Sequence, residues 1–356
     1  MIFYFPMDDI LNILSKTEDD AMRNSRRAVI IQPGAIGDCV LTLPLAESLK
    51  THFGIGTVLM FGRSSYIEYF PGRTCIDGIR NLDSIDLHRL FVNHREFELA
   101  DGDSLIGVFS GFEQIITFLG QTGSDFENNL IFTANCSNPV EVTTLQLKPG
   151  DNYAGHITKF HLDMFLSSQT SDVKSGEIDL KKTYITPCKT DLANGQKILS
   201  SAGVDTKQKV ALIHPGSGSA AKNWHIDNFF MLAEALREKN ISVAFTLGPV
   251  EMETFKTKTL DALGAIAPLL VDMSLTETFQ AVSCANCFIG NDSGVTHLAA
   301  AAGIPTIACW SATNPVHYHP VGPSVSVFQM NSGDFTSPCP QKANEIAQAA
   351  LKFLTS

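Results

Sequence analysis

Three short segments combine glycines with charged side chains just after an apolar run. The first, which follows the run at 28–31, is Gly34-Ala35-Ile36-Gly37-Asp38. An aspartate at the start of a helix has two uses. It can cap the helix by accepting a backbone N–H near the positive end of the dipole. It can also act as a general base on the rim of a cleft, held ionised by the same helix start. The two roles of Asp38 are compatible, and the sequence leaves both open.

The second segment, at 214–224, reads His-Pro-Gly-Ser-Gly-Ser-Ala-Ala-Lys-Asn-Trp. Its glycines and serines, including Ser217 and Gly218, offer closely spaced N–H and hydroxyl donors to an anion, and Lys222 adds a mobile positive charge. It is not a Walker loop, because no glycine precedes Lys222 and asparagine follows it. A flexible loop with a solvated lysine is the alternative interpretation.

The third segment begins with Gly290-Asn291-Asp292-Ser293-Gly294-Val295-Thr296-His297 and continues to Pro305. A buried strand is expected to stop at Gly290, and an alanine-rich helix to begin near Ser293. The N–H groups of Ser293, Gly294 and Val295 then form an anion site. A carboxylate repels phosphate, so Asp292 is expected to bond sugar hydroxyls or to orient Lys222. The alternatives are an aspartate cap and a core histidine at 297 bonded to backbone.

Apolar runs alternating with helical patterns position these segments. In the first half we predict strands at 28–31 and 57–61 around a helix at 38–52, and weaker strands at 104–109 and 129–132. In the second half the predicted strands are 210–214, 242–247, 268–271, 286–290, 304–309 and 324–328. The predicted helices there are 227–239, 251–262, 275–285, 294–302 and 341–354. Such alternation is typical of βαβ units and parallel sheets.

The fold prediction is therefore α/β, with two doubly wound Rossmann-like domains facing each other across a cleft. The 356 residues exceed the usual size of one core. We expect an N-terminal extension at 1–27, a first domain at 28–190, a linker region at 191–208 and a second domain at 209–330. Residues 331–356 are expected to form a C-terminal helix region, for which we consider packing back on the first domain. Ligands in such sheets bind beyond the carboxyl ends of the strands.

Composition excludes several classes of protein. Acidic residues outnumber basic ones 37 to 26, giving a formal net charge of −11. That balance argues against nucleic acid and against strong adhesion to anionic lipid. No apolar run approaches the roughly 20 residues of a spanning helix, and no secretory signal is recognised. The eight cysteines include one CxxC pair, at 284 and 287, and we expect them to be reduced thiols. We expect a cytoplasmic protein.

Together the three segments resemble glycosyltransferase family 9, the ADP-heptose:lipopolysaccharide heptosyltransferases. A GDxxxxxP block matches Gly37 to Pro44, an HPG…KxW block matches His214 to Trp224, and a DSGxxHLAAAxGxP block matches Asp292 to Pro305. One departure is Gln32, at a position near the first strand where the family often carries arginine or lysine.

The resemblance implies a GT-B fold and an inverting transfer that needs no metal and no cofactor. The donor would be a nucleotide-sugar, most simply ADP-heptose, and the acceptor a lipopolysaccharide core or related glycan, with at most peripheral contact with the inner membrane. Asp38 would be the catalytic base, beside an acceptor-side loop with Gly34, Ile36 and Gly37. The donor would be bound by Ser217, Gly218, Lys222, Asp292, Ser293, Gly294, Val295 and His297. A glutamate, Glu251 or Glu253, would hold the ribose.

Other interpretations remain open. A nucleotide-sugar epimerase or an NAD-dependent oxidoreductase shares the α/β pattern. Such an enzyme would need GxGxxG with an acidic residue about 20 residues later, and none follows the first strand. A GT-B relative that binds a nucleotide-sugar without catalysis is a third class. The pair His317 and His319 has no metal-binding partner nearby in sequence. The Asp101-Gly102-Asp103 triplet suits a turn better than a metal site.

Overall fold

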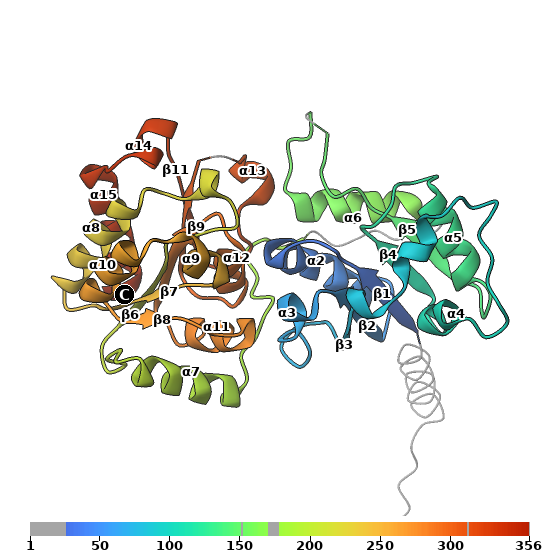
Figure 1. Cartoon of the computed structure of the whole chain (residues 1–356), viewed down its shortest axis with the longest axis horizontal. Coiled ribbons are helices and arrows are strands. Elements are labelled where there is room, and N and C mark those ends of the chain that lie inside the picture. The colour runs from blue at the N-terminus through green and yellow to red at the C-terminus, as the bar shows by residue number, and fades with distance from the viewer. Residues whose placement is uncertain (1–25, 151, 170–177, 312, 356) are drawn as a thin grey trace, which may run out of the picture.

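Figure 1 shows the computed structural model, which describes residues 26–150, 152–169, 178–311 and 313–355. It contains a five-stranded sheet in the order β3-β2-β1-β4-β5 and a six-stranded sheet in the order β11-β10-β9-β6-β7-β8. Every neighbouring pair of strands is parallel. The predicted arrangement of two doubly wound α/β units is confirmed. Of the extension predicted at 1–27, residues 1–25 lie outside the described residues, and Arg27 already belongs to β1.

The strands of the first sheet are β1 (Arg27–Ile31), β2 (Thr57–Gly62), β3 (Gly78–Asn81), β4 (Gln114–Thr117) and β5 (Glu141–Thr144). Its helices are α2 (Ile36–His52), α3 (Ser64–Ile67), α4 (Ser104–Phe109), α5 (Asp125–Ala134) and α6 (Ile157–Ser168), with 3-10 turns η1 (Leu82–Ser84) and η2 (Leu87–Phe91). Successive residues of β1 serve opposite faces. Ala28 and Ile30 join the core that includes α2, whereas Val29 and Ile31 join the core that includes α4 and α5.

The strands of the second sheet are β6 (Val210–His214), β7 (Ser242–Thr246), β8 (Leu269–Leu270), β9 (Cys287–Asn291), β10 (Thr306–Trp310) and β11 (Val325–Gln329). The longer helices are α7 (Lys189–Ser201), α8 (Ile226–Arg237), α9 (Pro249–Thr254), α10 (Thr257–Ile266), α11 (Leu275–Val282), α12 (Gly294–Ala301) and α15 (Pro340–Thr355). The shorter helices are the 3-10 helix η3 (Ala220–Lys222) and the α-helices α13 (Pro315–Tyr318) and α14 (Ser332–Thr336). Strands β6, β9 and β10 are buried along their whole length, as a sheet covered by helices on both faces requires.

The strand orders place a switch point in each sheet, where successive connections turn in opposite directions. It lies between β1 and β4 in the first sheet and between β6 and β9 in the second. Ligands of open α/β sheets bind beyond the carboxyl ends of the strands at such a point. The loops that follow β1, β6 and β9 are the three segments singled out from the sequence.

Two predicted strands of the first half are wrong. Residues 104–109 form α4, and residues 129–132 lie inside α5. Both helices begin at a side-chain cap: Asp103 accepts from Leu105 N, and Ser124 accepts from Glu127 N. These caps satisfy N–H groups that a strand would have given to a neighbour. A short apolar run alone does not separate the two structures.

The second half needs smaller corrections. The helix predicted at 251–262 is two helices, because α9 ends at Thr254 and α10 starts at Thr257. The region predicted as a linker at 191–208 contains most of α7, which packs against α11. The last helix, α15, packs against α8 and β9 rather than back on the first domain, because its buried alanines join the core of the second sheet. The predicted domain boundaries otherwise remain a prediction.

Across the described residues, no helix combines the length and the apolar character that crossing a membrane requires.

Candidate functional site

The helices α2 and α12 approach each other start to start, and this contact joins the two halves of the molecule (Figure 1). Glycine is needed at 294, because a side chain there would collide with Cβ of Ile36. Gly37 faces the ring of His297 in the same contact. Each helix start carries partial positive charge. Two such ends therefore meet at the place where the three segments converge.

Asp38 lies in the first turn of α2, two residues after its first residue. Ala35 occupies the cap position, and Asp38 Oδ2 accepts a hydrogen bond of 2.9 Å from Ala35 N. The side chain is nevertheless exposed and lines a pocket between the two halves. Asp38 thus stabilises the helix start and presents a carboxylate to the pocket, so the capping role and the chemical role coexist in its geometry.

The loop before Asp38 is held by Gln32, a buried residue to which sequence reasoning gave no role. Gln32 Oε1 accepts from Gly34 N at 3.0 Å, and its Nε2 donates to Thr42 Oγ1 at 2.9 Å. Thr42 Oγ1 in turn donates to Asp38 O at 2.8 Å. The residue that replaces the family's usual cation therefore fixes the loop and the first turn of α2. The glutamine at a position where the family often carries arginine or lysine was the one sequence feature that drew attention to this residue.

Lys222 and Asp292 form an ion pair across the switch point of the second sheet. Lys222 Nζ lies 2.7 Å from Asp292 Oδ2, which also accepts from Thr313 Oγ1 at 2.6 Å. Burial raises the pKa of the Asp292 carboxyl, but its contacts with His297, Lys222 and Thr313 outweigh burial and lower the pKa to about 2. Asp292 is therefore ionised, and of the two roles expected for it the geometry supports the orientation of Lys222.

His297 is buried, but it is not the backbone-bonded core histidine considered as an alternative. Its Nε2 lies 3.8 Å from Asp292 Oδ1. Its Nδ1 has no hydrogen-bond partner within the described part of the chain. The ring lies against Gly37 and lines the same pocket as Asp38. His297 thus connects Asp292 to the helix start of α2.

The loop after β6 is shaped by its own polar groups. Ser217 is buried, and its Oγ lies 2.7 Å from Asn223 Oδ1 and 2.8 Å from Ser219 O, so this hydroxyl is already engaged within the loop. Asn291, buried at the end of β9, donates to Pro215 O at 2.8 Å and accepts from Trp224 N at 3.0 Å. The sequence reasoning missed this bracing role of Asn291. Backbone groups around Gly218 remain at the pocket surface.

Of Glu251 and Glu253, the two candidates for holding the ribose, Glu251 lies at the site. It is buried, and its Oε2 accepts from Gly248 N at 2.7 Å at the start of α9. Gly216 allows this approach, because a side chain there would collide with the Glu251 carboxylate. Glu253 is exposed on the same helix.

Two pockets meet at the start of α12. The Asp38 pocket, of about 370 Å³, is lined by Ala35, Gly37, Asp38, Leu41, Lys148, Gly218, Ser219, Lys222, Asp292, Ser293, Gly294, His297, Thr313 and Tyr318. The Glu251 pocket, of about 450 Å³, is lined by Ala35, Ile36, Ser65, Tyr66, His214, Ser217, Gly218, Gly248, Pro249, Val250, Glu251, Met273, Ser274, Leu275, Thr278, Ser293, Gly294 and Val295. Ala35, Gly218, Ser293 and Gly294 line both. Apart from Gly34 and Glu253, the alternative to Glu251, every site residue predicted from the sequence lines one of these pockets. A side chain at Gly34 would collide with Asp38.

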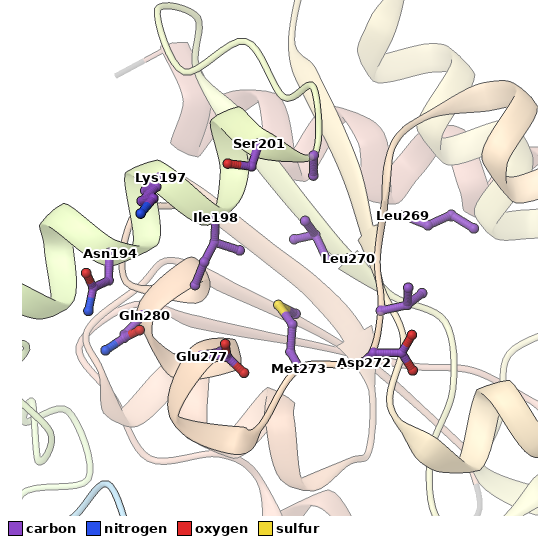
Figure 2. A pocket seen from close by; sticks show the side chains of 12 residues that line it. Asn194, Lys197, Ile198, Ser201, Leu269, Leu270, Asp272, Met273, Glu277 and Gln280 are labelled. Carbon is purple, nitrogen blue, oxygen red and sulfur yellow. The ribbon is translucent and has the colours of Figure 1, made fainter.

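Two further hollows lie nearby. The Thr144 pocket, of about 530 Å³, lies beyond the carboxyl ends of β4 and β5 and shares Lys148 with the Asp38 pocket. The hollow between α7 and α11, of about 540 Å³, is larger than the Asp38 pocket (Figure 2). Its lining, within the described chain, includes none of the predicted site residues, and it shares only Met273 with the Glu251 pocket.

The weaker candidates are bound into the structure in other ways. Asp103 pairs with Arg89 at 2.7 Å and caps α4, and Asp101 and Gly102 form the predicted turn. His317 Nδ1 lies 2.8 Å from Gly155 O. Among the residues that the structure describes, no three His, Cys, Asp or Glu side chains are grouped so as to hold a metal ion.

Comparison with known proteins gives a family match over the second half of the chain. The model for glycosyltransferase family 9 (heptosyltransferase) matches residues 164–347. A lipopolysaccharide core heptosyltransferase, OpsX of Haemophilus influenzae, is 28% identical over 134 residues, which is 36% of this chain and 39% of that protein. Lipopolysaccharide heptosyltransferase 3 of Escherichia coli is 28% identical over 141 residues, which is 38% of this chain and 40% of that protein. The matched stretch thus spans about two fifths of the length of these relatives.

Solved structures resemble the whole chain at low sequence identity. A glycosyl transferase of family 9 from Veillonella parvula has a TM-score of 0.68 at 15% identity, covering 93% of this chain and 97% of that one. The Escherichia coli heptosyltransferase WaaC with ADP has a TM-score of 0.63 at 15% identity, covering 92% and 99%. These likenesses show the fold, and it is the GT-B fold that the sequence predicted.

Proposed function

The chain belongs to glycosyltransferase family 9, and we propose that it transfers a sugar from a nucleotide-sugar to a hydroxyl group of a glycan. The proposed donor is ADP-heptose, and the proposed acceptor is a lipopolysaccharide core. The curated relatives named as heptosyltransferases support this choice. So does the likeness to a structure named as holding ADP.

The donor diphosphate is proposed to lie at the start of α12, where the two pockets meet. The N–H groups of Ser293, Gly294 and Val295 and the positive end of the helix suit an anion. Gly218 adds backbone at the same place. The sugar then extends into the Asp38 pocket and the nucleoside into the Glu251 pocket, where Glu251 is proposed to bond the ribose hydroxyls.

Asp38 is proposed to act as the general base. Its carboxylate takes the proton of the acceptor hydroxyl as that oxygen forms a bond to the anomeric carbon. The bond between that carbon and the diphosphate oxygen breaks on the opposite side, and the electron pair leaves with the nucleotide. The result is inversion at the anomeric carbon. Such base catalysis typically contributes about 10²–10⁴-fold to a rate.

The charge that develops on the leaving diphosphate is proposed to be stabilised by Lys222 and by the helix starts. Lys222 is presented to the pocket by Asp292, 2.7 Å away. Preorganised cations and dipoles of this kind are usually the largest electrostatic contribution to catalysis. We therefore propose a transfer that needs no metal ion and no cofactor.

The acceptor is proposed to enter through the Thr144 pocket of the first half. This pocket adjoins the Asp38 pocket through Lys148. An acceptor in the Thr144 pocket can direct a hydroxyl toward Asp38 and remain beside the cation of Lys148. The proposed place of action is the cytoplasm, with at most peripheral contact with the inner membrane.

One observation carries the proposal: Asp38 and Lys222 line the same pocket at the meeting point of two helix starts. The test is to incubate the full chain with ADP-heptose and a heptose-free lipopolysaccharide core and to measure ADP release and the mass of the glycan. The proposal expects one ADP for each added heptose. Binding of ADP without release from ADP-heptose would instead favour a nucleotide-sugar-binding protein without catalysis.

A further inference from the structure

We propose that Tyr66, from the first half of the molecule, stacks against the nucleotide base in the Glu251 pocket and thereby contributes to donor recognition. This inference rests on the proposed function, because it assumes that the pocket holds the nucleoside part of the donor. It means that the donor is bound from both halves rather than by the second half alone.

The Glu251 pocket is lined by groups of different chemistry, and the strand order β9-β6-β7-β8 indicates their sequence along the sheet edge. Ser293 and Gly294 follow β9, and Glu251 follows β7. The apolar side chains of Met273 and Leu275 follow β8, and Tyr66 lines the same pocket from α3, which is joined to Thr276 through Glu68. A nucleoside diphosphate has the same order of parts: anion, hydroxylated ribose, flat base. With the diphosphate at the start of α12 and the ribose at Glu251, we expect the base beside Met273, Leu275 and Tyr66.

Tyr66 is suited to meet a flat ring. It lies on α3, directly after β2, and is only half-buried. The guanidinium of Arg63 lies 5.7 Å from its ring centroid, a cation–π contact that helps to hold the ring. Aromatic side chains that line a pocket bind nucleobases by stacking, because every base has a π-face.

The segment that carries Tyr66 is fixed to the second half. Glu68 Oε1 accepts from Thr276 Oγ1 at 3.1 Å, so α3 is joined to α11 beside the pocket. Next along the chain, the rings of Tyr69 and Phe279 stack with centroids 5.4 Å apart. Arg73 pairs with Asp191, Nε to Oδ2, at 2.7 Å. Tyr66 is therefore held in place before the donor binds, and preorganisation of this kind reduces the entropy lost on binding.

Titration calorimetry of the full chain with ADP and with inorganic pyrophosphate tests the inference. Tyr66→Ala is expected to weaken ADP binding by about tenfold, within the range measured for loss of one stacking ring. Pyrophosphate has no base, so its binding should not change. Tyr66→Phe keeps the ring and should bind ADP within about twofold of wild type. Phe91→Ala, at an exposed aromatic residue outside these pockets, is the matched control.

The outcomes separate this inference from the proposed function. Equal ADP affinity of Tyr66→Ala and wild type would overturn the stacking role and leave the donor site intact. Loss of pyrophosphate binding together with ADP, or an equal defect in Tyr66→Phe and Tyr66→Ala, would also overturn it, because either points to a structural role. If wild type binds neither ADP nor pyrophosphate, the proposed function fails and the inference fails with it.

Discussion

Lys222 Nζ lies 2.7 Å from Asp292 Oδ2, and this ion pair joins the loop after β6 to the residue that follows β9. The carboxylate is almost fully buried, whereas the lysine is about one-third exposed and faces the Asp38 pocket. The buried partner therefore fixes the position of a cation that a ligand can still reach. Four predictions concern groups around this pair and the helix starts beside it, and a fifth concerns the contact between the halves at His156.

Replacing Lys222 is expected to affect both ligand binding and stability. Lys222→Ala removes a cation from the proposed diphosphate site, so ADP affinity should fall at least about tenfold. It also leaves the buried Asp292 carboxylate without that partner, which should cost about 1–3 kcal/mol in the free energy of unfolding. Lys222→Arg should restore only part of the affinity, because a planar fork replaces a compact charge. Calorimetry with ADP and urea unfolding measure both; an alanine variant with wild-type affinity would exclude Lys222 from the site.

Gly294→Ala is expected to push apart the starts of α2 and α12. The added methyl group would collide with Cβ of Ile36, and overpacking of this kind costs about 1–3 kcal/mol. Transfer should fall with it, because Asp38 and the proposed diphosphate site lie on opposite sides of this contact. The matched control is Gly107→Ala in α4, where nothing lies within 4 Å of an added Cβ. Equal activity and equal unfolding midpoints for both variants would show that the contact tolerates separation.

The contact between the halves is expected to weaken in mild acid through His156. Its Nε2 donates to His319 O at 2.9 Å, and its Nδ1 faces Thr158. Burial is the main reason that the pKa of His156 is lowered to about 3. The hydrogen bond to His319 O raises the pKa, and repulsion from the rings of His319, His297 and His161 lowers it further. In the unfolded chain the ordinary pKa is about 6.5, so between these values only the unfolded state gains a proton. Stability should therefore be lost as the pH falls below about 6.5, by about 2 kcal/mol at pH 5.

The variant His156→Gln can still donate to His319 O but does not titrate. Urea unfolding at pH 7.5 and pH 5 should show a smaller acid loss in this variant than in wild type. Burial also lowers the pKa of His161, to about 4, but His161 is present in both proteins and does not affect the comparison. An equal loss in the two proteins would contradict the assignment.

Removal of metal ions is expected to leave transfer unchanged. In the proposed mechanism Lys222 and the starts of α2 and α12 stabilise the leaving diphosphate, so no divalent ion is required. Turnover of ADP-heptose should be the same, within about twofold, in buffer with EDTA and in buffer with Mg²⁺. A large loss in EDTA that Mg²⁺ restores would show that a metal ion bears part of that charge.

The sequence predicted the second half better than the first, for physical reasons. Strands such as β9 and β10 are buried on both faces and are largely apolar over five residues each. Strands β4 and β5 have only four residues each, and they begin with Gln114 and Glu141, so no comparable run marks them. The runs at 104–109 and 129–132 were apolar enough to suggest strands instead, but local caps made them helices.

The site residues in the loops after strands could be predicted from the sequence, because the strand, the loop and the polar side chains are contiguous there. Residues that act through long-range contacts could not be predicted in this way. Gln32 joins the loop before Asp38, at Gly34, to Thr42 of α2. Asn291 braces the loop at Pro215 from a different strand. Tyr66 lines the Glu251 pocket from the first half, whose helix α3 is joined to α11 by the hydrogen bond between Glu68 and Thr276. Such relationships depend on the packing of two sheets and have no short sequence signature.

The most direct test of the account is the transfer rate of Asp38→Asn, measured together with its unfolding midpoint and its affinity for ADP. Asparagine keeps an oxygen that can accept from Ala35 N, so stability should fall by at most about 1 kcal/mol. It cannot take up the acceptor proton, so turnover of ADP-heptose should fall by about 10²–10⁴-fold with ADP affinity nearly unchanged. Normal turnover by a folded Asp38→Asn protein would contradict the assignment of the base and the mechanism built on it.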